Sequence, residues 1–143
     1  MAYFRNALLL DDDEVALYLH QIWLKNYDLA DNVIACRTTK EALSYIEHHG
    51  FGVSTDLLLL DIHMPVMNGF EFMEELFSLP NNGLGKNAYL FLLTSSTSHL
   101  DSNIASLFPL KGYLHKPLGA EQVEYIIATL GANGVSGKTK SAS

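Results

Sequence analysis

Short apolar runs alternate with longer amphipathic stretches along most of the chain. Each run is continuously hydrophobic rather than alternating with polar residues, which is typical of strands buried on both faces of a parallel sheet. Five runs predict five strands: Ala7–Leu10, Val33–Cys36, Leu57–Leu60, Tyr89–Leu93 and Gly112–Leu114.

The stretches between these runs carry apolar residues at helical spacing, which predicts amphipathic helices. Thr39 and Asn68 are the predicted N-caps of the second and third helices, and Trp23 on the first is expected to pack in the core. A short helix around Leu100–Phe108 is expected in the serine-rich segment 95–110. The apolar positions are Val15, Leu19, Ile22 and Trp23, then Ala42, Leu43 and Ile46, then Phe72, Met73, Leu76 and Leu79, and finally Val123, Ile126, Ile127 and Leu130.

The regular alternation of strand and helix predicts an α/β fold. Such a chain forms a doubly wound parallel sheet with helices on both faces and right-handed crossovers. Residues 1–130 are predicted to form this single domain. Residues 131–143 are rich in Gly, Ser and Lys and are predicted to be a flexible tail.

Composition narrows the classes of function. The chain has 143 residues, 48% of them hydrophobic, and a formal net charge of −7. An acidic protein lacks the basic surface that binding to nucleic acid or an anionic membrane requires, so neither is expected as a partner. The one cysteine, Cys36, excludes an internal disulfide and is expected to be a buried, inert thiol. No apolar run is long enough to cross a membrane, and we expect a cytoplasmic protein.

Polar residues follow four of the five predicted strands. Carboxyl ends of parallel strands meet at one edge of the sheet, where ligands bind in open α/β folds. Several carboxylates, a hydroxyl and an ammonium group are therefore expected to converge there. The residues at the strand ends are Asp11–Glu14, Asp61, Thr94–Ser96 and Lys116–Pro117.

Clustered carboxylates repel one another unless a cation joins them. Mg²⁺ binds a few carboxylates with a carbonyl and waters, and it leaves positive charge available for a phosphoryl group. Lys116 and the Thr94 hydroxyl could contact the phosphoryl oxygens, and Asp61 could act as the nucleophile toward phosphorus.

Ordinary structural roles account for each of these residues when it is taken alone. Asp11–Asp13 could cap a helix, and Asp13 and Glu14 are expected to do only that. Asp61 could be a turn residue, Thr94 a strand-end hydroxyl and Lys116 a solvated surface lysine. Their joint occurrence at successive strand ends favours a site.

Four motifs, "LLLDDDE", "LLLLDIHMPVMNG", "FLLTSS" and "GYLHKPL", together resemble the signature set of the response-regulator receiver domain. The resemblance covers residues from about 5 to 130. It implies a flavodoxin-like strand order 2-1-3-4-5 and identifies Asp61 with the phosphoacceptor.

The same resemblance implies further roles. Asp11 and Asp12 match the acidic pair of a Mg²⁺ site, with Asp12 the more direct ligand, and His63 would contribute its backbone carbonyl. Thr94 matches the switch hydroxyl and Lys116 the lysine that contacts the phosphoryl group. Tyr113 matches an aromatic residue that reorients on activation. Pro117 stands where the family often has a cis peptide bond.

The resemblance implies a phosphorylation-activated response regulator rather than an enzyme. Its donor would be a sensor histidine kinase or a histidine phosphotransfer protein, and the downstream target stays open. Ser95, Ser96, His63 and the 95–110 segment depart from the family's usual residues.

Three other functions compete with that interpretation. A haloacid-dehalogenase-type phosphatase would need an Asp where His63 stands. A flavodoxin-like carrier would need a phosphate-binding loop where Asp11–Asp13 would repel phosphate. A receiver-like interaction module that works without phosphorylation remains the alternative.

Overall fold

Five parallel strands form one sheet in the order β2-β1-β3-β4-β5. The computed structural model describes residues 2–61, 69–79, 85–94 and 110–132. All five predicted strands and their predicted order are confirmed, and each strand extends slightly beyond its apolar run. The strands are β1 (Phe4–Leu10), β2 (Ala30–Cys36), β3 (Asp56–Asp61), β4 (Ala88–Thr94) and β5 (Gly112–His115).

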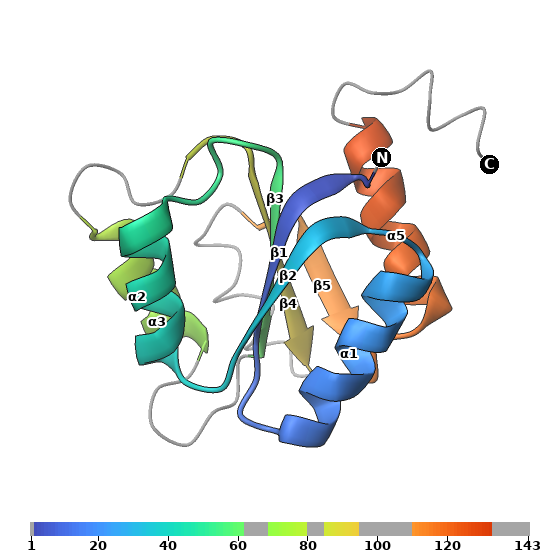
Figure 1. Ribbon diagram of the computed structural model, residues 1–143, viewed down its shortest axis with the longest axis horizontal. Coiled ribbons are helices and arrows are strands. Elements are labelled where there is room, and N and C mark those ends of the chain that lie inside the picture. The colour runs from blue at the N-terminus through green and yellow to red at the C-terminus, as the bar shows by residue number, and fades with distance from the viewer. Residues whose placement is uncertain (1, 62–68, 80–84, 95–109, 133–143) are drawn as a thin grey trace.

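Helices cover both faces of the sheet, with α1 and α5 on one side and α2 and α3 on the other (Figure 1). The predicted Asn68 cap and the predicted helix around Leu100–Phe108 lie outside the described residues. The last helix runs two residues past the predicted domain boundary at residue 130. The helices are α1 (Glu14–Asn26), α2 (Thr39–His49), α3 (Gly69–Phe77) and α5 (Ala120–Ala132).

The central strand β3 supplies side chains to two separate hydrophobic cores. Leu57 and Leu59 belong to the α1/α5 core, between the sheet and those two helices. Leu58 and Leu60 belong to the α2/α3 core on the opposite face. Successive side chains of a strand point to opposite faces, so a strand covered on both sides must be apolar throughout. This explains the uninterrupted run of four leucines.

The predicted inner face of α1 is wrong. Val15, Leu19 and Ile22 are exposed by 66%, 46% and 36%. Of the four predicted positions only Trp23 packs against the α1/α5 core. The other three positions and the exposed Tyr18 form a surface that we call the outer face of α1: Val15, Tyr18, Leu19 and Ile22.

The true inner face of α1 consists of Leu17, His20 and Leu24, which are all buried. These residues also have helical spacing, so α1 carries two apolar stripes. The histidine in the middle made the buried stripe look polar, and the pattern therefore favoured the other one.

The predicted N-cap of α2 is also wrong by one residue. Thr38 is the N-cap, because its hydroxyl accepts a hydrogen bond of 3.1 Å from the backbone N–H of Glu41. The Glu41 carboxylate accepts one of 3.1 Å from the backbone N–H of Thr38, which completes a capping box. Thr39 is the first helical residue and is buried. The glutamate three residues after Thr38 is the signal that distinguishes the two threonines.

Two other observations concern single features of the chain. Cys36 is buried as expected, and burial, with the nearby Glu41 carboxylate, raises the pKa of its thiol to about 11. Among the helices of the described residues, none has the length and apolar character needed to cross a membrane.

Candidate functional site

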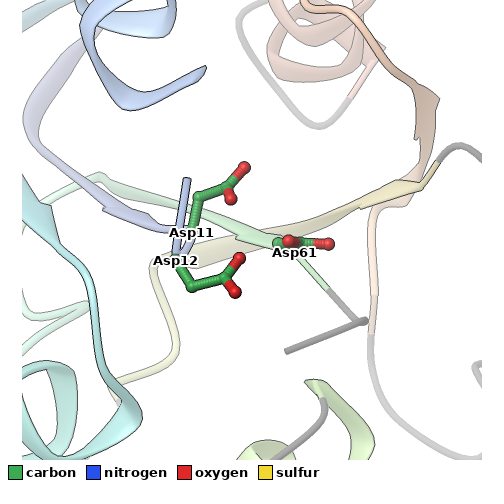
Figure 2. A group of neighbouring side chains, drawn as sticks. All are labelled: Asp11, Asp12 and Asp61. Carbon is green, nitrogen blue, oxygen red and sulfur yellow. The ribbon is translucent and has the colours of Figure 1, made fainter. Parts of the chain in front are cut away.

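Three carboxylates meet at the carboxyl ends of β1 and β3. Asp11 and Asp12 follow β1, and Asp61 is the last residue of β3. One oxygen from each lies within 4.8 Å of the others, and Figure 2 shows the three side chains gathered there. Asp11 and Asp61 are buried, whereas Asp12 is the most exposed of the three. The convergence expected for these three residues is confirmed.

Lys116, which follows β5, joins this group. Its Nζ lies 3.0 Å from Oδ2 of Asp11 and 3.1 Å from Oδ2 of Asp61. Burial alone would lower the pKa of Lys116, but the two carboxylates outweigh this effect and raise the pKa above its usual value. The ammonium group therefore stays charged and bridges the ends of β1 and β3.

One buried oxygen of the cluster lacks a well-directed hydrogen bond. Oδ1 of Asp11 accepts a bond of 3.0 Å from the backbone N–H of Asp13. Oδ2 of Asp11, within the described part of the chain, receives only the close approach of the Lys116 ammonium without hydrogen-bond geometry. Three carboxylates share the positive charge of Lys116, so the cluster keeps an excess of negative charge that a further cation would compensate. The donor set therefore fits a hard cation such as Mg²⁺.

Local structure fixes where each acid points. The backbone N–H of Asp11 donates to the carbonyl of Cys36, which holds the end of β1 against β2. Asp13 is the N-cap of α1, and its Oδ1 accepts from the N–H groups of Val15 and Ala16 at 3.0 and 3.3 Å. The expected capping role of Asp13 is confirmed. It leaves Asp12, between these two anchors, directed toward the cluster.

Thr94 and Lys116 are tied together by the backbone. Thr94 ends β4 and is buried, and the backbone N–H of Lys116 donates to its carbonyl at 2.9 Å. The Lys116–Pro117 peptide bond is cis, as the resemblance implied. Tyr113 on β5 is half-buried against the α2/α3 core. His63, Ser95 and Ser96 lie outside the described residues.

The sequence patterns did not identify two buried polar residues, His20 and Asp56. His20, on the inner face of α1, has a pKa lowered chiefly by burial, an effect that Lys116 reinforces and Asp11 opposes. Its spacing of three from Leu17 and four from Leu24 was the available signal.

Asp56, the first residue of β3, is the second. Its Oδ1 accepts from the backbone N–H and the side-chain amide of Asn6, at 3.2 and 3.0 Å, and its Oδ2 accepts from the backbone N–H of Gly52 at 2.7 Å. Its partners are distant in sequence, so no local motif predicted this arrangement.

The chemical capacity of the site follows from these contacts. Asp61 is a carboxylate held rigidly at a strand end, beside a permanent positive charge and next to a possible cation site. Such a group can attack an electrophile, and the surrounding positive charge would stabilise a polyanion such as a phosphoryl group.

Comparison with known proteins gives the same picture. Residues 7–128 match the family model described as the response regulator receiver domain. No curated protein matches the chain.

Several solved structures share the fold. The chemotaxis protein CheY4 of Vibrio cholerae is 22% identical with a TM-score of 0.73, over 89% of this chain and 98% of that one. A response regulator receiver protein from Dyadobacter fermentans is 24% identical with a TM-score of 0.76, over 88% and 97%. The bacteriophytochrome response regulator RtBRR is 27% identical with a TM-score of 0.72, over 90% and 78%.

Proposed function

The chain belongs to the family of response regulator receiver domains, and on this premise we propose that it is a phosphorylation-activated response regulator with Asp61 as phosphoacceptor. The phosphoryl donor is the phosphohistidine of a sensor histidine kinase or a histidine phosphotransfer protein, and a cytoplasmic location is part of the same proposal. The observation that carries the proposal is the position of buried Asp61, 3.1 Å from Lys116 and grouped with Asp11 and Asp12.

The proposed reaction is a single phosphoryl transfer. A carboxylate oxygen of Asp61 forms a bond to phosphorus while the bond from phosphorus to the donor imidazole nitrogen breaks. The imidazole leaves with the electron pair of that bond and takes up a proton. Transfer of this kind depends on positioning and on stabilisation of charge, which a rigid strand end and a fixed cation supply.

Asp11, Asp12 and Asp61 would hold a Mg²⁺ ion, with the predicted backbone carbonyl of His63 as a further ligand. When bound, the ion supplies positive charge that neutralises the phosphoryl oxygens. The mutual closeness of the three acids, which together outnumber the charge of Lys116, supports this assignment. The side chain of His63 has no part in it.

Lys116 and Thr94 act on the product. The Lys116 ammonium, already 3.1 Å from Asp61, donates to an oxygen of the phosphoryl group once it is attached there. The Thr94 hydroxyl donates to another oxygen, and its movement allows Tyr113 to turn inward. A charge-assisted hydrogen bond of about 1.5–3 kcal/mol is enough to shift such a two-state element roughly tenfold or more.

The alternative is an interaction module that binds partners without phosphorylation. Such a module has no use for a lysine that forms salt bridges with two buried carboxylates. The distances of 3.0 and 3.1 Å from Lys116 to Asp11 and Asp61 therefore favour the phosphorylated switch.

The test is the intact mass of the protein after incubation with acetyl phosphate and Mg²⁺. Wild-type protein should gain one phosphoryl group, and Asp61→Asn, which keeps the shape but removes the nucleophile, should gain none. Equal phosphorylation of the Asp61 variant would show that the acceptor lies elsewhere. A folded wild-type protein that gains no mass would favour the interaction module.

The outer face of α1 adjoins the site, because α1 begins directly after Asp11–Asp13. A protein that brings a phosphohistidine to Asp61 must cover this region. The four exposed side chains of this face form a surface smaller than the about 800 Å² per partner of a stable complex. That size suits a transient donor, and we propose that the donor contacts this face.

Leu19→Glu should therefore slow transfer from phosphohistidine proteins tenfold or more and leave acetyl phosphate reactivity unchanged. The measurement is transfer from a panel of radiolabelled histidine kinases and phosphotransfer domains of the same organism. Val53→Glu is the matched control, because Val53 is exposed but lies before β3, at the other end of the sheet. If Leu19→Glu and Val53→Glu accept phosphate from the best donor equally fast, the donor docks elsewhere.

A further inference from the structure

Tyr125 of α5 lies directly against the backbone of β5. A Cβ atom added to Gly112 would be 2.8 Å from the Tyr125 hydroxyl oxygen and 2.9 Å from its Cε2. Carbon atoms do not approach so closely without displacing a neighbour, so the ring occupies the space where other residues carry a side chain. Glycine at this position is what allows the contact.

The same ring also contacts β4. Tyr125 and Phe91 meet edge to face, with ring centroids 6.1 Å apart and an interplanar angle of 79°. Phe91 is the register partner of Gly112 across the β4–β5 ladder. The Tyr125 ring thus spans the two strands that end in Thr94 and lead to Lys116.

The residue after Gly112 is Tyr113, the proposed switch aromatic. Adjacent residues in a strand point to opposite faces, and Tyr113 packs on the α2/α3 core. Tyr125 therefore contacts, from the α1/α5 side, the backbone that carries Tyr113. When the β5 backbone moves at Gly112, the Tyr125 ring must move with it, because there is no free space between close-packed groups.

The contact between Tyr125 and Gly112 is one of packing and not of hydrogen bonding. Across residues 2–61, 69–79, 85–94 and 110–132, the Tyr125 hydroxyl forms no hydrogen bond. The side chain is nevertheless 48% exposed. One edge of the ring thus contacts the sheet while another part lies on the molecular surface.

We propose that Tyr125 is a positioning residue that carries displacement of β5 at Tyr113 to α5, so that the exposed surface of α5 changes with phosphorylation. The proposal rests on the proposed function, since it takes the movement of Thr94 and Tyr113 as its source. The buried residues Val123, Ile126 and Leu130 fix α5 to the core through side chains. Tyr125, in contrast, contacts the backbone next to the moving residue.

The test compares amide chemical shifts with and without beryllofluoride and Mg²⁺. In wild-type protein the amides of Tyr113 and of residues 121–129 should both shift. In Tyr125→Ala the shifts at Thr94 and Tyr113 should persist, while those in residues 121–129 fall by more than half. Tyr125→Phe keeps the ring and lacks only the hydroxyl, so it should respond like wild type. Because each variant is compared with itself with and without the mimic, a structural change that does not depend on the mimic cancels.

Gly112→Ala should reduce the α5 shifts in the same way as Tyr125→Ala, because its methyl group displaces the ring from β5. Glu121→Ala, which removes an exposed side chain from the first turn of α5 itself, is the matched control and should respond like wild type. A full α5 response in Tyr125→Ala would overturn the inference while leaving the proposed function intact. No response at Tyr113 in wild-type protein would overturn both.

Discussion

Strand β3 begins and ends with a buried carboxylate, and the two ends differ in how that charge is compensated. Asp56 is 3% exposed and Asp61 4%. At the first end, neutral N–H donors from Asn6 and Gly52 surround the carboxylate. At the last end, the neighbours are two further carboxylates and one ammonium group.

The difference separates a structural role from a functional one. Both oxygens of Asp56 accept hydrogen bonds from the chain itself, so its environment is complete and ties β3 to β1 and to the loop before it. The cluster around Asp61 places three carboxylates beside one lysine, and the repulsion among them destabilises the folded state. Burial and residue type are the same at both ends, and only the partners distinguish Asp56 from the end at which we propose that phosphorylation takes place.

The largest expected effect is on stability at the Asp56 end. Asp56→Ala leaves three N–H donors without their acceptor, that of Gly52 in a buried bond and the two of Asn6 in partly buried ones, and it should lower the free energy of unfolding by about 3 kcal/mol. For a chain of this size the melting temperature should fall by about 9 °C. Thermal unfolding followed by circular dichroism measures it.

The matched variant is Asp61→Ala, which removes an equally buried carboxylate from the other end of the strand. Its stability should stay within about 1 kcal/mol of wild type, because Lys116 keeps Asp11 as a partner and a repulsive charge is lost. Phosphorylation by acetyl phosphate should show the reverse order, retained in Asp56→Ala and absent in Asp61→Ala. Equal destabilisation by both substitutions would abolish the distinction between the two ends.

The smaller expected effect is of Mg²⁺ on stability at the Asp61 end. A ligand at ten times its dissociation constant stabilises the folded state by about 1.4 kcal/mol. Mg²⁺ should therefore raise the melting temperature by about 4 °C, since it relieves repulsion among Asp11, Asp12 and Asp61. Differential scanning calorimetry across a Mg²⁺ titration measures it.

Asp12→Asn should lose most of this increase, because the exposed member of the cluster is the proposed direct ligand. Asp31→Asn removes an equal charge from an exposed position on β2, outside the cluster, and should keep the increase. The same response in both variants would mean that Mg²⁺ acts by general screening and not at the site.

Sequence patterns predicted the sheet well because each strand contains an unbroken apolar run, which is the pattern expected where helices cover both faces of a sheet. The converging acids and Lys116 were predicted because parallel strands bring their carboxyl ends to one edge. The inner face of α1 was not predicted, since two stripes compete and a buried histidine lies on the correct one.

Asp56 and Tyr125 were not predicted for a different reason. The partners of Asp56 are Asn6 and Gly52, and the contact of Tyr125 with Gly112 depends on how α5 lies across β5. Neither arrangement leaves a periodic signal, because each depends on residues that only the folded chain brings together.

The two carboxylates of β3 also matter before the chain has folded. Between them lies Leu57–Leu60, a run of high hydrophobicity without charge or proline, which belongs to the class of segments that pair with copies of themselves. Native pairing of β3 with β1 needs residues about fifty positions apart, so loop closure delays it and leaves the run exposed in the nascent chain. A charge directly at each end of such a run opposes self-association. Asp56 and Asp61 thus oppose self-association of this strand during the interval in which neither has yet reached its partners in the folded protein.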